Sequence, residues 1–225
     1  MSMPKSFAEI FDCSAVIFDL DGTLVDTAQD IVAATDALLA ECGHAPIGFA
    51  AGRRLIGDGA RTLVQQAFLA SGAPAPDIDA ATARWFEIYG ESLASFSKPY
   101  PHVAPTLAAL RKRGRKLGVC TNKADALAVR LLELLDLAGS FDAVVGGDVP
   151  HRKPDPRHLL ATAERIGVLP RACLMVGDSP NDAAAAKAAR MPIVVVDWGY
   201  SSIVPAALGG DAVIGDFSEL EALVA

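Results

Sequence analysis

From residue 103 onward, amphipathic helical segments alternate with short apolar runs, and this alternation restricts the fold more than any other feature of the chain. The helical segments cover about 103–113, 125–135, 156–166 and 180–190, and the apolar runs after them cover 117–120, 143–145, 173–176 and 193–196. Further runs at 15–18 and 212–214 open and close the series. Such alternation predicts an α/β fold with a doubly wound parallel sheet, in which ligands bind at the carboxyl ends of the strands.

The segment from 27 to 98 departs from this alternation. Its apolar periodicity is helical, starting with a helix over about 28–40, and breaks fall at 43–48, 57–59 and 71–76. Pro99-Tyr100-Pro101 marks the return, because proline resists continuing a helix. We therefore expect a core formed by residues 1–26 and 99–225, with residues 27–98 as a helical insertion. A chain of 225 residues, 52% of them hydrophobic, can bury a core of that size.

The net charge and the cysteines narrow the range of partners and compartments. A formal charge of −7 disfavours nucleic acid and anionic membranes as partners. No apolar stretch reaches the roughly 18 residues of a membrane span, and residues 1–12 lack the apolar core of a signal peptide. Cys120 and Cys173 lie inside apolar runs, which favours buried, reduced thiols and a cytoplasmic protein. We expect a monomer or a homodimer.

Four short polar clusters lie in loops or just past the apolar runs. They are Asp19-Leu20-Asp21-Gly22-Thr23, Thr121-Asn122-Lys123, Lys153-Pro154-Asp155-Pro156 and Gly177-Asp178-Ser179-Pro180-Asn181-Asp182. Because the carboxyl ends of parallel strands share one edge of the sheet, we expect carboxylates, a hydroxyl and an ammonium to gather there. That set is what a magnesium-dependent phosphoryl-transfer site requires.

The first cluster holds two carboxylates two residues apart. Such a pair repels unless a cation lies between the two groups or one of them is protonated, so a simple turn is the less favoured interpretation. Asp19 can act as a nucleophile, since carboxylates form aspartyl-phosphate intermediates. Asp21 can give a proton to the leaving oxygen and later take one from water.

The later clusters supply phosphate and metal ligands. Thr121 suits a phosphate oxygen, although an N-cap by Thr121 or Asn122 is the better interpretation of that cluster taken alone. Lys153 can neutralise the transferring phosphoryl group, although an isolated loop lysine is usually only solvated. Asp178 is the expected direct magnesium ligand, and Asp182 can ligate or orient; a helix N-cap by Asp178 or Ser179 is the alternative.

With all four clusters in order, the chain resembles the haloacid dehalogenase superfamily of phosphohydrolases over about residues 15–223. The resemblance implies a Rossmann-like core with a helical cap inserted after the first cluster. It implies that Asp19 is the nucleophile and Asp21 the acid and base, and that Thr121 and Lys153 hold the phosphoryl group, with Asn122 beside them. Mg²⁺ would be held by Asp19, the main-chain carbonyl of Asp21 and Asp178, with support from Asp182.

Within this superfamily the chain is most similar to phosphoglycolate phosphatases. The segments that carry this similarity are Asp26-Thr27-Ala28-Gln29-Asp30, Ile56-Gly57-Asp58-Gly59-Ala60, Val144-Val145-Gly146-Gly147-Asp148 and Trp198-Gly199-Tyr200. Asp58 replaces an asparagine expected between the two cap glycines. The similarity implies 2-phosphoglycolate as the substrate, a small phosphorylated metabolite, with Gly57, Asp58, Gly59 and Arg61 as cap residues near it. Its carboxylate would need a cation, for which Arg53, Arg54, Arg61 and Lys123 are candidates.

Other activities on the same fold differ in the residues they need. A dehalogenase has no leaving alkoxide to protonate, so Asp21 argues against it. A phosphonate hydrolase would use a cap lysine, and residues 27–97 contain none. A phosphosugar mutase shares the first steps and stays an alternative, as do phosphatases of sugar phosphates, nucleotides or pyrophosphate. A non-catalytic binding module would tend to lose Asp19 or a metal-binding acid, and all of these are present.

Overall fold

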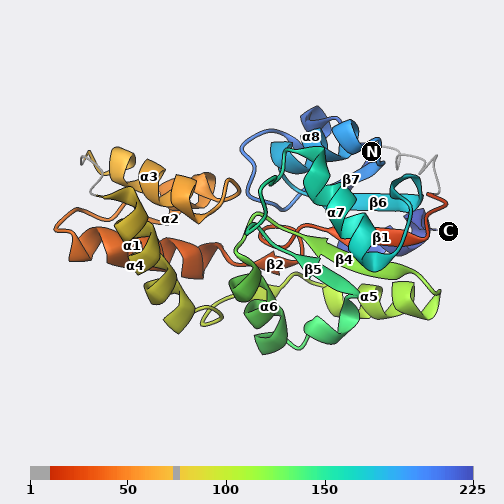
Figure 1. Ribbon diagram of the computed structural model, residues 1–225, viewed down its shortest axis with the longest axis horizontal. Helices are drawn as coiled ribbons and strands as arrows, with labels where there is room; N and C mark the ends of the chain where they lie inside the picture. Colours follow the sequence, from red (N-terminus) through yellow and green to blue (C-terminus); the bar gives the residue numbers. More distant parts are fainter. Residues whose placement is uncertain (1–10, 73–76, 225) are drawn as a thin grey trace, which may run out of the picture.

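A six-stranded parallel sheet forms the centre of the computed structural model, which describes residues 11–72 and 77–224 (Figure 1). The strand order is β5-β4-β1-β6-β7-β8. These strands are β1 (Ala15–Phe18), β4 (Lys116–Cys120), β5 (Ala143–Val145), β6 (Cys173–Gly177), β7 (Ile193–Val196) and β8 (Ala212–Ile214). The central strands are almost wholly apolar because helices cover both faces of the sheet.

Side chains of β1 alternate between two hydrophobic cores. Val16 and Phe18 pack with α5 (Val103–Lys112), α6 (Asp125–Leu134) and α9 (Leu220–Leu223). Ala15 and Ile17 pack on the opposite face with α7 (Pro156–Ile166) and α8 (Pro180–Ala189). All four β1 residues are fully buried. The predicted doubly wound parallel sheet is therefore confirmed.

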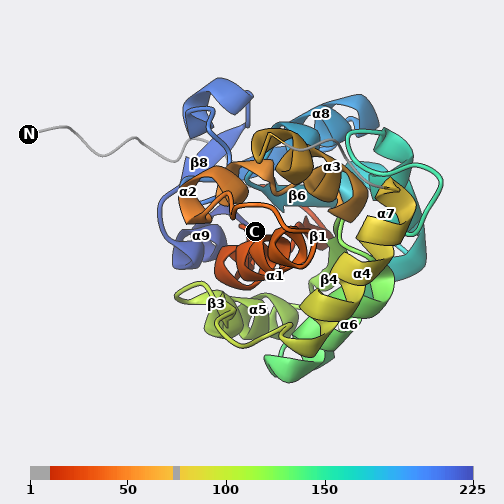
Figure 2. The ribbon, with the colours of Figure 1, turned by 90° about the vertical axis from the view of Figure 1, so that its left-hand side faces the viewer.

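The helical segment inserted between β1 and α5 forms a separate layer at the side of the sheet, on the left of Figure 1 and facing the viewer in Figure 2. It contains α1 (Ala28–Glu41), α2 (Phe49–Gly52), α3 (Ala60–Ala70) and α4 (Ile78–Glu91), which we call the helical unit. Helix α1 packs against α3 and α4, and the Trp85 indole N–H donates to Thr35 Oγ1 in their interface. The helical periodicity of this part of the sequence is thus realised in four helices of the described residues.

Two short strands join the helical unit to the core. Strands β2 (Val25–Asp26) and β3 (Lys98–Pro99) pair antiparallel, so the chain enters and leaves the helical unit at one place. Beside them, the buried Asp30 carboxylate accepts hydrogen bonds from the backbone N–H groups of Phe96 and Ser97 and from the Ser97 hydroxyl, 2.6 Å away. Strands of two residues have no periodicity, which explains why the sequence does not reveal this pair.

Short 3₁₀ helices complete the connections. They are η1 (Arg53–Leu55), η2 (Ala138–Ser140), η3 (Pro170–Ala172), η4 (Pro205–Leu208) and η5 (Phe217–Glu219). Among the residues with a described placement, no helix is long and apolar enough to cross a membrane. Cys120 and Cys173 are buried free thiols, as expected. The expected lack of a signal peptide concerns mostly residues 1–10, and the expected break at 71–76 mostly residues 73–76; both lie outside the described ranges.

Candidate functional site

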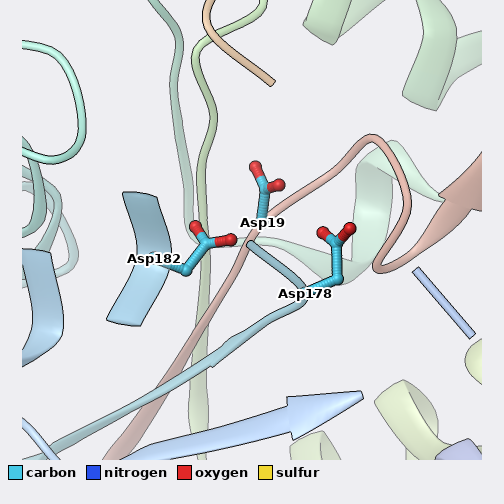
Figure 3. A group of neighbouring side chains, drawn as sticks. All are labelled: Asp19, Asp178 and Asp182. Atoms are coloured by element: carbon cyan, nitrogen blue, oxygen red, sulfur yellow. The ribbon is translucent and has the colours of Figure 1, made fainter. Parts of the chain in front are cut away.

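Three carboxylates from different parts of the sequence meet at the carboxyl edge of the sheet. Asp19 follows β1, Asp178 follows β6, and Asp182 lies in the first turn of α8. One oxygen from each lies within 4.8 Å of the others, and Figure 3 shows the three side chains around a common point. They converge because β1 and β6 are hydrogen-bonded neighbours, which places Asp19 beside the start of the Asp178 loop.

A buried lysine ammonium lies against this cluster. Lys153 Nζ is 2.7 Å from Asp19 Oδ1 and 2.6 Å from Asp182 Oδ1, and the side chain is almost fully buried. The other oxygen of Asp182 accepts hydrogen bonds from the backbone N–H and the hydroxyl of Ser179, which caps α8. Asp182 therefore uses both oxygens to hold neighbouring protein groups.

Burial and crowding determine the protonation of the cluster. Burial raises the pKa of Asp19 to about 8, with the Lys153 charge opposing this and the charges of Asp182 and Asp178 adding to it. Burial and the Asp182 charge raise the pKa of Asp178 to about 7. Burial alone would lower the pKa of Lys153, but the carboxylates of Asp182 and Asp19 outweigh burial and raise it. The lysine thus stays an ammonium, and the carboxylates favour a cation between them.

The donor set of the cluster fits a hard divalent cation. Carboxylate oxygens are the ligands that Mg²⁺ prefers, and a divalent ion would offset both the burial and the mutual repulsion that raise the pKa values of Asp19 and Asp178. Asp178 is held ready for this by two donors: Thr23 Oγ1 at 3.0 Å and the Tyr200 backbone N–H at 2.7 Å. The residues present therefore fit a metal centre.

Close packing of glycine backbone against Asp178 gives a direct test of its position. A Cβ atom at Gly199 would overlap the Cβ and carboxylate atoms of Asp178. We expect Gly199→Ala to displace this carboxylate and to weaken Mg²⁺ binding by about 10- to 100-fold, the range for lost support of a ligand. Calorimetric titration of the protein with Mg²⁺ measures this. Gly90→Ala is the matched control, because a Cβ there meets nothing within 4 Å; equal affinities for the two variants would contradict the expectation.

The second carboxylate of the first cluster, Asp21, has partners of its own. Its Oδ1 accepts from Thr27 Oγ1 at 2.7 Å and from Lys123 Nζ at 3.1 Å. Lys123 Nζ also donates to the Tyr89 hydroxyl at 2.7 Å. Burial would lower the pKa of Lys123, yet the Asp21 charge and Tyr89 raise it, so the side chain remains an ammonium.

Thr121 and Asn122 lie between the acid cluster and the helical unit. Thr121 is buried, and its Oγ1 accepts from the Lys123 backbone N–H. The Asn122 amide donates to the carbonyls of Gly57 and Lys153, both at 2.9 Å. Helix α6 begins only at Asp125 and has no side-chain cap, so neither residue serves as the N-cap considered from the sequence.

The loop at 57–59 lies against the core. Asp58 Oδ1 accepts from the Asn181 amide at 2.7 Å, and the Gly57 carbonyl accepts from Asn122. Gly59 has φ +85°, and a Cβ there would be 2.6 Å from the Arg152 guanidinium. The fourth cap residue named from the sequence, Arg61, instead forms an exposed ion pair with Asp79 at 2.9 Å.

A cavity of about 240 Å³ lies between the helical unit and the core. It is lined by Asp19, Asp21, Thr121, Asn122, Lys123 and Lys153 from the core, by Gly57, Gly59, Arg61 and apolar side chains from the helical unit, and by Arg152. A second cavity, of about 340 Å³, opens on the other side of the loop at 57–59, where Arg54 and Asp178 line it. Six candidate core residues and three of the four cap residues named from the sequence therefore line the first cavity, whereas Asp58 and Asp178 line the second.

Three residues at this site carry no role in the sequence analysis. Tyr89 and Arg152 contact it only through the tertiary fold, and no local pattern marks them. Tyr200 belongs to the segment Trp198-Gly199-Tyr200, which carries the similarity to phosphoglycolate phosphatases but is assigned no role from the sequence. Its hydroxyl accepts hydrogen bonds from the backbone N–H groups of Thr27 and Ala28 and donates one to Asp26. Arg53 lies over the Tyr200 ring and donates to the Gly199 carbonyl at 2.6 Å. These contacts join the start of the helical unit to the core.

Comparisons with known proteins agree with this geometry. A family model described as haloacid dehalogenase-like hydrolase matches residues 13–190. Phosphoglycolate phosphatase from Rhodospirillum rubrum is 46% identical over 92% of this chain and 88% of its own length, and that from Agrobacterium fabrum is 43% identical over 91% and 89%. A crystal structure of a predicted phosphoglycolate phosphatase from Haemophilus somnus superposes with a TM-score of 0.87 at 29% identity, covering 93% of this chain and 96% of the other. The chain therefore belongs to the haloacid dehalogenase-like hydrolase family.

Proposed function

We propose that this protein is a magnesium-dependent phosphatase that hydrolyses a small phosphate monoester, with 2-phosphoglycolate as the substrate. The observation that carries the proposal is the buried Asp19–Lys153 pair, 2.7 Å apart, set among further carboxylates beside a cavity of about 240 Å³. A nucleophilic carboxylate next to a fixed ammonium suits phosphoryl transfer, and the phosphatase relatives at 40–46% identity support the choice of substrate.

Asp19 and Asp21 divide the chemistry in this proposal. An Asp19 oxygen forms a bond to phosphorus while the bond from phosphorus to the glycolate oxygen breaks, and that oxygen takes a proton from Asp21. Water then attacks the phosphorus of the aspartyl phosphate, and Asp21 accepts the proton that the water loses. Asp19 and inorganic phosphate are released. Lys153 and Thr121 bind the phosphoryl oxygens, and Lys153 offsets their negative charge throughout.

We assign the metal ligands from the same cluster. Asp19, the main-chain carbonyl of Asp21 and Asp178 would hold Mg²⁺, which supplies charge neutralisation for the phosphoryl group when bound. Asp182 has both oxygens engaged with Lys153 and Ser179, so we assign it the task of orienting Lys153 beside the metal. Asn122, whose amide joins Gly57 to Lys153, would shape the phosphate pocket mainly by fixing these two loops.

The helical unit acts as a cap in this proposal. The cap consists of residues 27–98, and the core consists of residues 1–26 and 99–225. The hinges between them lie near 26–28 and 97–101. The loop at 57–59 closes the cavity through its contacts with Asn122 and Asn181, which excludes bulk water from the reacting groups. Gly57, Asp58 and Gly59 would therefore limit the space for the substrate, and they would not bind it by charge.

The glycolate carboxylate needs a cation that no protein carboxylate already neutralises. Arg61 pairs with Asp79, Lys123 pairs with Asp21, and Arg53 donates to the Gly199 carbonyl. Arg54 lines the second cavity and not the one that holds Lys123 and Lys153. Arg152 lines the 240 Å³ cavity, and its guanidinium has neither an ion pair nor a hydrogen bond with any residue described in the structure. We therefore assign carboxylate binding to Arg152, the residue before Lys153.

Replacing this arginine tests the assignment. Arg152→Met keeps the stem length and removes the charge, so we expect KM for 2-phosphoglycolate to rise about 10- to 100-fold, equivalent to about 1.4–2.8 kcal/mol for a charge-assisted contact. The KM for p-nitrophenyl phosphate, which has no carboxylate, should change less than about twofold. Steady-state kinetics on both esters measure this, with Arg171→Met, on the exposed η3 turn, as the control. An equal rise for both esters would assign Arg152 a role other than carboxylate binding.

Phosphate release from a substrate panel tests the function itself. The panel contains 2-phosphoglycolate, glucose 1- and 6-phosphates, nucleoside monophosphates, pyrophosphate and p-nitrophenyl phosphate, each with and without Mg²⁺. We expect selective, magnesium-dependent hydrolysis of 2-phosphoglycolate. Activity spread over the other esters would keep the chemistry and remove the substrate. Interconversion of sugar phosphates in the presence of the bisphosphate would instead favour a mutase.

We also propose a cytoplasmic location and a monomeric or homodimeric state. The buried, unpaired thiols of Cys13, Cys120 and Cys173 suit a reducing compartment.

A further inference from the structure

The helical unit places one buried hydroxyl next to the catalytic edge of the core. Tyr89, on α4, is fully buried, and burial raises the pKa of its hydroxyl to about 12, so it keeps its proton at neutral pH. This oxygen accepts a hydrogen bond from Lys123 Nζ at 2.7 Å. A buried hydroxyl with one charged partner across two structural layers is a specific contact, since leaving either group unpaired would cost free energy.

Lys123 carries this contact onward to Asp21. Its Nζ lies 3.1 Å and 3.3 Å from the two oxygens of the Asp21 carboxylate, so the ammonium is shared between a residue of the helical unit and one of the core. The second partner of Asp21 is Thr27 Oγ1, from the start of the helical unit, at 2.7 Å. Every hydrogen bond that fixes the Asp21 side chain among the described residues therefore comes from Lys123 or Thr27.

We propose that Tyr89 and Lys123 are positioning residues that orient the Asp21 carboxylate for proton transfer, and that they do so only while the helical unit lies on the core. This inference rests on the proposed function, in which Asp21 is the acid and base. Asp21 lies in the turn after β1, and its side chain is only partly buried. When the helical unit moves away, Lys123 loses its Tyr89 partner and can turn from Asp21.

Such an arrangement restricts proton transfer to the closed state. The contact that orients Asp21 forms together with the closure that excludes bulk water from the cavity. An open site would then hold a bound ester without an aligned acid, and premature loss of the phosphoryl group to solvent would be suppressed. The structure thus links closure to the proton-transfer residue by one chain of three side chains.

The deciding experiment is a double-mutant cycle between Tyr89 and Asp21. Tyr89→Phe removes only the hydroxyl and preserves the packing of the ring on Trp85. Its kcat/KM would be measured with the alkyl phosphate that the wild-type protein hydrolyses fastest, alone and combined with Asp21→Asn. We expect Tyr89→Phe alone to lower kcat/KM about tenfold, a fraction of the 10²- to 10⁴-fold effect of a complete acid or base. In the Asp21→Asn background, Tyr89→Phe should lower kcat/KM by less than about twofold, because the carboxylate that Tyr89 helps to position is then absent.

The leaving group supplies a second, independent readout. Nitrophenolate departs without a proton, so Tyr89→Phe and Lys123→Met should lower kcat/KM for p-nitrophenyl phosphate much less than for the alkyl ester. Arg53→Met is the matched control, since it removes a different contact between the helical unit and the core, at Gly199. We expect Arg53→Met to lower kcat/KM by the same factor for both esters, whether residue 21 is aspartate or asparagine.

These outcomes distinguish the inference from the function on which it rests. A Tyr89→Phe defect that persists undiminished with Asp21→Asn, or that slows both esters alike, would overturn the positioning role. So would an Arg53→Met profile identical to that of Tyr89→Phe, because general loosening would then explain both. An Asp21→Asn variant as active as the wild type on the alkyl ester would instead remove Asp21 from the proposed mechanism.

Discussion

Asp19→Asn is expected to abolish phosphatase turnover, lowering it by about 10⁴-fold or more, as losing a nucleophile does elsewhere. The amide oxygen can still accept from Lys153, so the substitution keeps the local geometry. Because burial raises the pKa of Asp19 to about 8, this carboxyl is mainly uncharged at neutral pH in the metal-free protein, and a neutral amide of the same shape replaces it without a change of charge. The melting temperature of the metal-free protein should therefore not fall. Phosphate release and a thermal melt measure the two effects.

An exposed aspartate provides the control for this change. Asp136 has φ +56°, a conformation that asparagine adopts readily, and it lies away from the cavity. Asp136→Asn should leave turnover within about twofold of wild type, as surface substitutions usually do. Retained turnover in Asp19→Asn would remove Asp19 as the nucleophile. A collapsed melting temperature would show that its role is structural.

Lys153→Met is expected to lower kcat/KM by about 10²- to 10³-fold, the effect of removing one preorganised electrostatic group. Methionine fills most of the buried space but leaves Asp19 and Asp182 without their shared cation. Breaking a buried ion pair costs about 3–5 kcal/mol, so the melting temperature should fall as well. Steady-state kinetics and thermal melts of the metal-free protein measure both.

The pH dependence of this loss follows from the Asp19 pKa. A carboxyl with its pKa raised to about 8 is mainly protonated, and therefore uncharged, below that pH. The Lys153 ammonium then stabilises it less than it stabilises the ionised carboxylate. The stability deficit of Lys153→Met should therefore grow as the pH rises through 8, where Asp19 ionises. Lys187→Met, on the exposed face of α8, is the control and should show no such growth. A deficit that shrinks with rising pH would contradict the assigned pairing.

The sequence predicts the sheet almost residue by residue, because its strands are apolar runs bounded by polar clusters. The runs at 15–18, 143–145 and 193–196 coincide with β1, β5 and β7, and the others differ by one residue at most. Helix α7 ends at Ile166 as expected, and Gly167 follows with φ +71°, a usual helix stop. Local periodicity is sufficient for these elements.

The site is less accessible to such reasoning where its contacts are long-range. Asp19 and Asp178 could be placed on one edge because each follows a strand of a parallel sheet, although their catalytic roles remain predictions. The partnership of Tyr89 with Lys123 depends on how α4 packs against the core, which no local pattern encodes. Arg61 shows the same limit: its place beside the glycines at 57 and 59 predicts a position at the cavity, which it lines, but the ion pair that it forms with Asp79 has no local signal in the sequence.

The antiparallel pairing of β2 with β3 has a consequence for how the protein can change. Because Val25 lies opposite Pro99 and Asp26 opposite Lys98, the two ends of the helical unit are neighbours in space. A segment with adjacent ends can be lengthened, shortened or exchanged while the sheet keeps its register. The helical unit, which lines one side of the cavity, can therefore diverge independently of the core residues that line the other side, and the proposed reacting groups need not be disturbed.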